Sequence, residues 1–376
     1  MDKKLKVVTI LGTRPEIIRL SRVISKLNES FDHKLIHTGQ NYDYELNEIF
    51  FEDLELDAPD YYLGAASTNP SEYIGEVIQK VDKLLDELKP DAVLILGDTN
   101  STLSAIPAKK RHIPIFHMEA GNRCFDQRVP EEINRKIIDH ISDINMPYST
   151  IARDYLINEG VPINQIIKTG SPMNEVLSYY NSKIERSDIL SKMDLKERDY
   201  FLISCHREEN VDIDSRLNKL VSILNYLGDE LNKKVLFSTH PRTRKRIEAS
   251  GYEISKSVEL SKPLNFSDYV NLQIHSIAVL SDSGTITEET SILGLDSLNI
   301  RDSHERPEGM EEGTVMMTGL NLSRVKDAIN ILQSQSGTKF STVDDYKSDN
   351  VSDKVVRIIL SHVDFINRVV WKQYND

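Results

Sequence analysis

Three carboxylates follow apolar runs or open predicted helices in the first half of the chain. Asp98 comes directly after DAVLIL, Glu119 lies in HMEAG, and Glu132 lies in PEEINR. Ordinary interpretations exist, because carboxylates cap helices and favour the positive end of the helix dipole. Three of them at one end of a domain would nevertheless be costly unless protons are moved or a cation is held. The pattern therefore favours acid–base chemistry.

Basic clusters follow apolar runs in the second half. His206 ends one run within SCHREEN, where it can serve as an acid, a base or a phosphate ligand. A surface polar loop explains this segment equally well. HPRTRKR at 240–246 could hold phosphate or be a solvated helix start, and RDSHERPE at 301–308 carries another His-Glu-Arg cluster just after a predicted strand.

Two segments combine an apolar strand, a glycine turn and a helix. They are LKVVTILGTRPE at 5–16 and IAVLSDSGTITEE at 277–289. Such a turn presents free backbone N–H groups and a positive dipole end, which suit a phosphate. Arg14, in the loop at the mouth of the first helix, could grip a diphosphate, and Glu289 could accept the two hydroxyls of a ribose. The alternatives are a plain turn with a solvated arginine and an ordinary helix carboxylate.

Alternating apolar runs and helical stretches predict an α/β fold that positions these groups. The predicted strands are 6–11, 34–38, 92–96, 113–117, 144–147 and 166–169, then 200–205, 234–239, 277–281, 297–300 and 314–317. In open parallel sheets a ligand lies beyond the carboxyl ends of the strands. The candidate residues therefore lie where a ligand would lie.

The length of 376 residues suits two domains, and the two strand–glycine–helix segments suggest that these domains face one nucleotide across a cleft. We place the boundary at TGSP, so that residues 1–170 carry the carboxylates and 171–345 form a second α/β domain. Residues 346–376 read as a long amphipathic helix that packs back on the first domain.

Composition excludes several classes of function. A net charge of −13 argues against a nucleic-acid groove, and no stretch approaches the ~20 apolar residues that span a bilayer. There is no sign of a signal peptide. Two cysteines, Cys124 and Cys205, argue against a disulfide framework and fit a reducing cytoplasm, and no Cys/His cluster has zinc spacing. We expect a cytoplasmic protein without nucleic-acid partner or membrane insertion.

Taken in order, eight motifs make the chain resemble the non-hydrolysing UDP-N-acetylglucosamine 2-epimerase family. They are GTRPE at 12–16, HTGQ at 37–40, GDT at 97–99, HMEAG at 117–121, PEEINR at 130–135, HREEN at 206–210, DSGTITEE at 282–289 and ERPEGMEEGT at 305–314. The resemblance implies two Rossmann-like domains in a glycosyltransferase-B arrangement, with a UDP-sugar in the interdomain cleft. It also implies a homodimer and no NAD or metal.

The resemblance also implies roles for individual residues. The acid/base carboxylates fall on Asp98, Glu119 and Glu132, and the active-site histidine on His206. The nucleotide ligands fall on Arg14, Ser283, Gly284 and Glu289 in the UDP-binding second domain, and the wider substrate-binding set adds Arg19, Arg135, Arg207, His240, Thr285 and Arg306. The implied reaction is anti elimination of UDP to a bound 2-acetamidoglycal, then re-addition of UDP with the C2 proton on the other face. Because that proton is weakly acidic, a base must act as the stabilised diphosphate departs.

The chain departs from the common form of the family at four places. Gly284-Thr285 replaces a glycine pair, Glu208 a basic residue, Arg19 a lysine, and Asn41 a histidine of the regulatory UDP-N-acetylglucosamine site. Four segments resemble the UDP-N-acetyl-L-fucosamine synthase branch instead: QNYDYELNE at 40–48, MEAGNRCFDQRVPEE at 118–132, HREENVD at 206–212 and ERPEGMEEGTVMMTGL at 305–320. That branch acts on UDP-2-acetamido-2,6-dideoxy-L-talose and makes a precursor of capsule or O-antigen lipopolysaccharide.

Four alternatives stay open at this point. The first is a UDP-N-acetylglucosamine/UDP-N-acetylmannosamine epimerase, and the second is a hydrolysing relative that releases UDP. The third is a silent UDP-sugar-binding protein, which the intact carboxylates and His206 oppose. The fourth is a glycosyltransferase of the same architecture, which would not need three convergent carboxylates.

Overall fold

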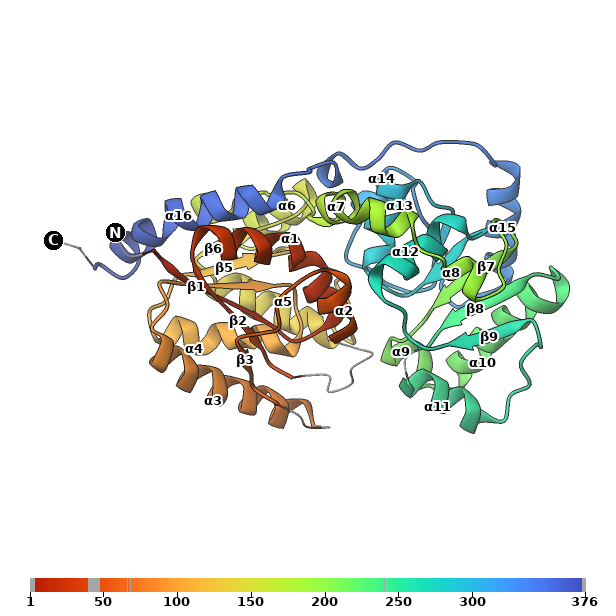
Figure 1. The fold of residues 1–376 in the computed structure, drawn as a ribbon, viewed down its shortest axis with the longest axis horizontal. Helices are drawn as coiled ribbons and strands as arrows, with labels where there is room; N and C mark the ends of the chain where they lie inside the picture. The colour runs from red at the N-terminus through yellow and green to blue at the C-terminus, as the bar shows by residue number, and fades with distance from the viewer. Residues whose placement is uncertain (1–3, 40–47, 66, 68, 240, 374–376) are drawn as a thin grey trace. The chain divides into compact units, whose positions relative to one another are not determined.

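The computed structural model of the protein describes residues 4–39, 48–65, 67, 69–239 and 241–373 (Figure 1). The chain forms two compact units, Met1–Tyr179 with Asp345–Asp376, and Tyr180–Asp344. The break falls after Tyr179 instead of at residue 170, because the start of α7 (Met173–Glu185) binds the returning C-terminal segment. Asn174 Nδ2 donates to Lys347 O at 3.0 Å, and Glu175 accepts from Ser352 N at 2.9 Å.

The first unit contains a six-stranded parallel sheet in the order β3-β2-β1-β4-β5-β6. Its elements are β1 (Lys6–Leu11), α1 (Arg14–Ser30), β2 (Asp32–His37), α2 (Glu48–Asp53), β3 (Tyr61–Tyr62), α3 (Pro70–Leu88), β4 (Ala92–Leu96), the 3-10 helix η2 (Asn100–Ser104), α4 (Ala105–Lys110), β5 (Ile115–Met118), α5 (Pro130–Ile141), β6 (Ile144–Met146), α6 (Thr150–Asn158), the 3-10 helix η3 (Ile163–Gln165), the first part of α7, the 3-10 helix η5 (Asp344–Tyr346) at the chain's return, and α16 (Val351–Val369). The chain reverses its winding between β1 and β4, which are neighbours.

The second unit repeats this topology, with parallel strands in the order β12-β11-β10-β7-β8-β9. Its elements are α8 (Ile189–Lys192), β7 (Tyr200–Ser204), α9 (Glu208–Val211), α10 (Asp214–Asn225), the π-helical turn η4 (Tyr226–Glu230), β8 (Lys234–Ser238), α11 (Pro241–Ser250), β9 (Val258–Ser261), α12 (Phe266–His275), β10 (Val279–Ser281), α13 (Thr285–Leu293), β11 (Ser297–Asn299), α14 (Glu308–Glu311), β12 (Met316–Met317) and α15 (Leu322–Ser334). The reversal falls between β7 and β10. A reversal of this kind opens a crevice at the carboxyl ends of the two strands, where α/β proteins bind ligands.

The central strands are hydrophobic along their whole length because helices cover both faces of each sheet. All five residues of β4, AVLIL, are buried, as are all five of β7, YFLIS. In the first unit, helices α3 and α4 contribute Val77, Val81 and Ala108 to a core that they share with β4 and its neighbouring strands. The two-domain Rossmann-like α/β prediction is confirmed.

The last helix belongs to the first unit. Helix α16 packs along α1 and presents a buried stripe of Val351, Val355, Ile359 and Val363 at four-residue spacing (Figure 1). Among the described residues, no helix is both long and apolar enough to cross a membrane.

Two details of the sheets differ from the sequence prediction. The predicted strand at 166–169 is wrong, since Ile166 forms just an isolated bridge with Asn145. Thr169 N donates to Pro147 O, but proline has no N–H to return, so the ladder cannot continue. Strands β3 and β9 were not predicted, because they are short edge strands with few buried residues.

Candidate active site

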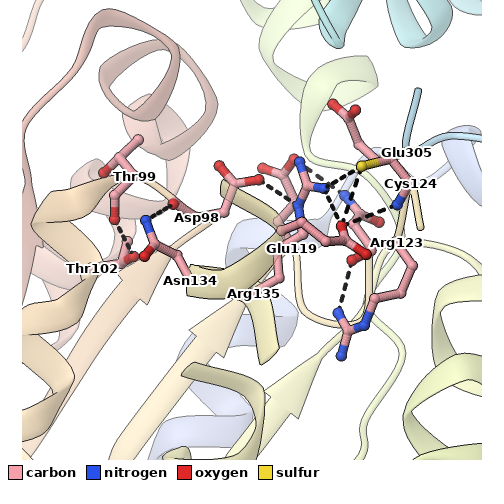
Figure 2. Close-up of polar contacts among 12 residues, drawn as sticks. Asp98, Thr99, Thr102, Glu119, Arg123, Cys124, Asn134, Arg135 and Glu305 are labelled. Carbon is pink, nitrogen blue, oxygen red and sulfur yellow. Dashed lines mark hydrogen bonds and ion pairs between the residues drawn. The ribbon is translucent and has the colours of Figure 1, made fainter. Parts of the chain in front are cut away.

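Asp98 lies on the turn after β4, at the reversal point of the first sheet. Gly97 before it has φ +75°, a left-handed conformation that glycine adopts without strain. Helix α5 fixes the turn: Asn134 Nδ2 donates to Asp98 O at 2.9 Å, and Arg135 Nε donates to Asp98 Oδ2 at 2.7 Å (Figure 2). The Asp98 side chain keeps 23% of its surface exposed, so it can meet a ligand.

Glu132 lies on the first turn of α5 and is almost fully buried. Its carboxylate accepts hydrogen bonds from Cys124 N and Phe125 N, both at 3.1 Å, and from Arg135 Nη1 at 2.7 Å. Burial alone would raise the pKa of Glu132, but the Cys124 amide and the Arg135 guanidinium hold that pKa below its usual value. Arg135 therefore bridges two carboxylates, those of Asp98 and Glu132.

Glu119 follows β5 and adopts the left-handed region with φ +64°, which is uncommon for a residue with a side chain. Its carboxylate forms an ion pair with Arg19 of α1 and accepts from Asn122 Nδ2 at 3.3 Å. A Cβ atom on Gly97 would lie 3.5 Å from Glu119 Oε2. The carboxylate of Glu119 thus lies beside the turn that carries Asp98.

The backbone N–H groups predicted to bind an anion at Gly12 have an internal partner in the structure. The N–H groups of Gly12 and Thr13 donate to Glu16 Oε2 at 3.0 and 2.7 Å, so the helix's own carboxylate occupies them. Burial raises the pKa of Glu16 to about 7. Sequence reasoning missed this residue, although Thr-x-x-Glu is the capping-box pattern that signals it. Arg14 is not in the loop as predicted but opens α1, where its guanidinium lies 5.6 Å from the ring centre of Phe50.

In the second unit, His206 and Arg207 follow β7 at the reversal point. Both backbone N–H groups donate to the buried carboxylate of Asp282, at 3.1 and 2.9 Å, and His206 Nδ1 lies 3.5 Å from Asp282 Oδ1. Burial alone would raise the pKa of Asp282, but His206 and these donors lower it. Arg207 Nε donates to Asp282 O at 3.1 Å. A sequence motif was visible here, but the part played by Asp282 was not predicted.

The turn after β10 carries Ser283, Gly284 and Thr285. The hydroxyls of Ser283 and Thr285 lie 2.9 Å apart, and Arg306 Nε donates to Gly284 O at 2.9 Å. The structure thus brings the three turn residues together with Arg306. A Cβ on Gly284 would lie 2.5 Å from Glu305 Oε1, so a side chain there would displace Glu305.

Glu289 lies on α13, the helix that follows this turn. Its side chain is buried, and its carboxylate accepts a hydrogen bond from Gln273 Nε2 at 2.6 Å. Among predicted site residues, His240 lies outside the residues that the structure describes, as do Gln40 and Asn41 of the regulatory motif. No group of three or more His, Cys, Asp or Glu side chains within the described ranges is arranged to hold a metal ion.

Comparison with known proteins identifies the family of the chain. The family model described as UDP-N-acetylglucosamine 2-epimerase matches residues 25–360, and the chain belongs to this family. The predicted enzyme class, a non-hydrolysing UDP-sugar 2-epimerase, is confirmed.

Three relatives show how similar the chain is to other members. A solved UDP-N-acetylglucosamine 2-epimerase from Rickettsia bellii is 51% identical, with a TM-score of 0.92 over 98% of this chain and 100% of that one. The Methanocaldococcus jannaschii UDP-GlcNAc 2-epimerase, solved in complex with UDP-GlcNAc and UDP, is 33% identical, with a TM-score of 0.90 over 95% and 100%. A UDP-2,3-diacetamido-2,3-dideoxy-D-glucuronate 2-epimerase from Pseudomonas aeruginosa is 34% identical over 84% of this chain and 88% of its own. The two relatives at 33% and 34% identity therefore carry names with different sugars, and the relative at 51% identity is named for UDP-N-acetylglucosamine.

Proposed function

We propose that this chain inverts C2 of a UDP-2-acetamido sugar by anti elimination of UDP and re-addition of UDP to the bound glycal. One observation carries the proposal: Asp98, Glu119 and Glu132 converge with Arg19 and Arg135 at the reversal point of the first sheet. Separate carboxylates beside one substrate can take a proton from one face of C2 and return it to the other.

The environments of the three carboxylates suggest different tasks. Asp98 is the most exposed of the three, and the Glu119 carboxylate lies beside the turn that carries Asp98, which suits groups that exchange a proton with C2. Glu132 has a lowered pKa and several donors, so it is a poor proton acceptor. We assign Asp98 and Glu119 to proton transfer, and Glu132 to holding Arg135 in place.

The second unit would hold the nucleotide. The small turn Ser283-Gly284-Thr285 offers hydroxyl groups and a backbone amide to the diphosphate, with His206 and Arg207 on the neighbouring strand end. Glu289 would reach the ribose after exchanging its bond with Gln273, and Arg14 would stabilise the departing charge. The homodimer and the capsule or O-antigen role stay predictions.

For the sugar, we propose UDP-2-acetamido-2,6-dideoxy-L-talose, giving UDP-N-acetyl-L-fucosamine. The support is the resemblance of residues 118–132 to that branch, together with Phe125, whose side chain is 67% exposed. Phe125 N donates to Glu132 Oε1, so this ring lies on the loop beside the acid–base cluster. An apolar surface there suits a C6 methyl group and leaves a C6 hydroxyl without water partners, at a cost of about 1–3 kcal/mol.

The second candidate is UDP-N-acetylglucosamine, which the relative solved with that ligand favours. Incubation with each UDP-sugar in deuterium oxide, followed by NMR at C2, separates the two candidates. We expect C2 inversion with deuterium incorporated at C2, and faster turnover of the L-talose substrate. Equal or faster turnover of UDP-N-acetylglucosamine would replace the proposed sugar and leave the reaction standing. Inversion without deuterium would overturn elimination–addition, and release of free sugar with UDP would indicate a hydrolysing enzyme.

A further inference from the structure

We propose that His117 is a positioning residue: a buried imidazolium that ties the turn carrying Asp98 to the turn that follows Glu119. The inference rests on the proposed function, because it gives those two carboxylates their roles. His117 lies on β5, between β4 and β6, and its side chain is 1% exposed. Its surroundings decide which protons the ring carries.

Both ring nitrogens of His117 face hydrogen-bond acceptors. Nε2 lies 2.9 Å from the carbonyl oxygen of Gly97, and Nδ1 lies 3.0 Å from Asp139 Oδ1. A neutral ring carries one N–H, so it would turn a lone pair toward one of these oxygens. The doubly protonated ring donates to Gly97 O and turns its second N–H side to the Asp139 carboxylate, which balances the charge of the ring as an ion pair.

Asp139, on α5, extends the connection to the second turn. Its carboxylate accepts from Gly121 N at 3.2 and 3.3 Å and from Arg123 Nη1 at 2.7 Å. Gly121 lies two residues after Glu119 and has φ +82°. The His117–Asp139 pair therefore holds the carbonyl of Gly97, just before Asp98, and the amide of Gly121, two residues after Glu119.

The charged groups around the pair favour the cationic ring. Arg123 is positive, but it is itself paired with Glu159 at the end of α6, and Asn145 of β6 is uncharged. Burial alone would lower the pKa of His117, but the hydrogen bond and charge of Asp139 raise it above the usual value. Burial alone would raise the pKa of Asp139, but His117 and Arg123 lower it. The two shifts have the same origin, because each partner stabilises the charged form of the other, and they agree with the geometry of the pair.

The two turns need such a fixed connection. Gly97 and Glu119 both adopt left-handed backbone conformations, and the Glu119 carboxylate lies beside Gly97. A small shift of either turn would change the distance between Asp98 and Glu119. Misplacing a catalytic group by about 1 Å can cost roughly 10²-fold in rate.

The ring itself gives the first test, since it does not depend on activity. In the wild-type protein labelled with ¹⁵N-histidine, we expect both His117 nitrogens to show imidazolium shifts at about pH 7. His33 supplies a matched neutral reference, because it is also buried in the first unit and burial lowers its pKa to about 4. A neutral tautomer of His117 at that pH would overturn the proposal.

Kinetics give the second test. We expect His117→Gln to lower kcat about 10- to 100-fold with little change in KM, and to shift the pH profile, because the turns lose their charged connection. His33→Gln should keep normal kcat. Normal kcat and pH profile in His117→Gln, with wild-type epimerisation intact, would overturn the positioning role alone. Absence of wild-type epimerisation would overturn the proposed function, while the NMR result still decides the charge of the ring.

Discussion

The two units use the same strand–turn–helix pattern in opposite ways. After β1, the amides of Gly12 and Thr13 are occupied by Glu16, three residues into the helix. After β10, no hydrogen bond joins the Gly284 amide to another described residue, and the nearest acid of α13, Glu288, pairs with Arg306 instead. An acid at the capping-box position closes such a turn to anions, and its absence leaves the turn open. The difference supports our proposal that the second unit binds the nucleotide and the first unit handles the proton.

Removing the proton-transfer groups of the first unit should have the largest effect. We expect Asp98→Asn and Glu119→Gln each to lower kcat by at least ~10²-fold, as for lost general acid–base groups. UDP affinity measured by calorimetry should stay unchanged, because these groups do not hold the nucleotide. Glu131→Gln, next to the buried Glu132 on α5, is the matched control. Near-normal kcat in both variants would contradict the assignment of proton transfer to the first unit.

Changes in the second unit should act on the nucleotide. We expect Glu289→Ala to weaken UDP binding by ~1–3 kcal/mol, the contribution of one charged hydrogen-bonding group. Gly284→Ala should weaken it too, because the new Cβ would occupy the turn itself and collide with Glu305 Oε1. The exposed Glu259 on β9 supplies the control Glu259→Ala. Unchanged UDP affinity in Glu289→Ala would remove that residue from the site.

Glu132→Gln should be milder than the other carboxylate variants. Its lowered pKa makes it a support for Arg135, so we expect kcat to fall about tenfold, which is below the roughly 10²- to 10⁴-fold loss typical of acid–base groups. Turnover assays over a range of pH distinguish the roles. A loss as large as that of Asp98→Asn would make Glu132 a proton-transfer group.

The smallest effect that we expect comes from the titration of Glu16, and it concerns the stability of the fold. Its pKa is raised from about 4.5 to about 7, so the folded state holds a proton that the unfolded state releases. Stability from this group is therefore full below about pH 4.5 and falls as the pH rises to about 7. We expect the Tm of the wild type, relative to that of Glu16→Gln, to drop by a few degrees across that pH range. This drop corresponds to a loss of about 1–3 kcal/mol in the free energy of unfolding. A difference independent of pH would contradict the shifted pKa, and Glu29→Gln on the exposed face of α1 is the control.

The sequence predicts the parts of this site that depend on local pattern. The fully buried strands β4 and β7 are predictable from their apolar runs, and so are the polar residues that follow them. Long-range partners carry no such signal: Arg19 meets Glu119 a hundred residues away, and Asp282 meets His206 across two neighbouring strands. Such pairs depend on strand order, which single-residue types do not encode.

The turn at Gly12 could be predicted only in part from the sequence. The Thr-x-x-Glu pattern was present in GTRPE, but the glycine turn suggested an anion site more strongly. The turn after β1 has an acidic residue at the capping-box position, and the turn after β10 does not. The position of that acid was therefore more informative than the glycine that both turns share.

The return of the chain to the first unit has a consequence for biosynthesis. The second unit, Tyr180–Asp344, is one uninterrupted stretch inserted into the first. During translation its strands are all complete before α16 is made, and α16 is the last helix of the first unit. Domains fold as their segments emerge, so the inserted unit can finish first. Until the ribosome reaches Val369, the surface of α1 that α16 covers stays bare, and a nascent chain truncated before α16 would expose it to aggregation.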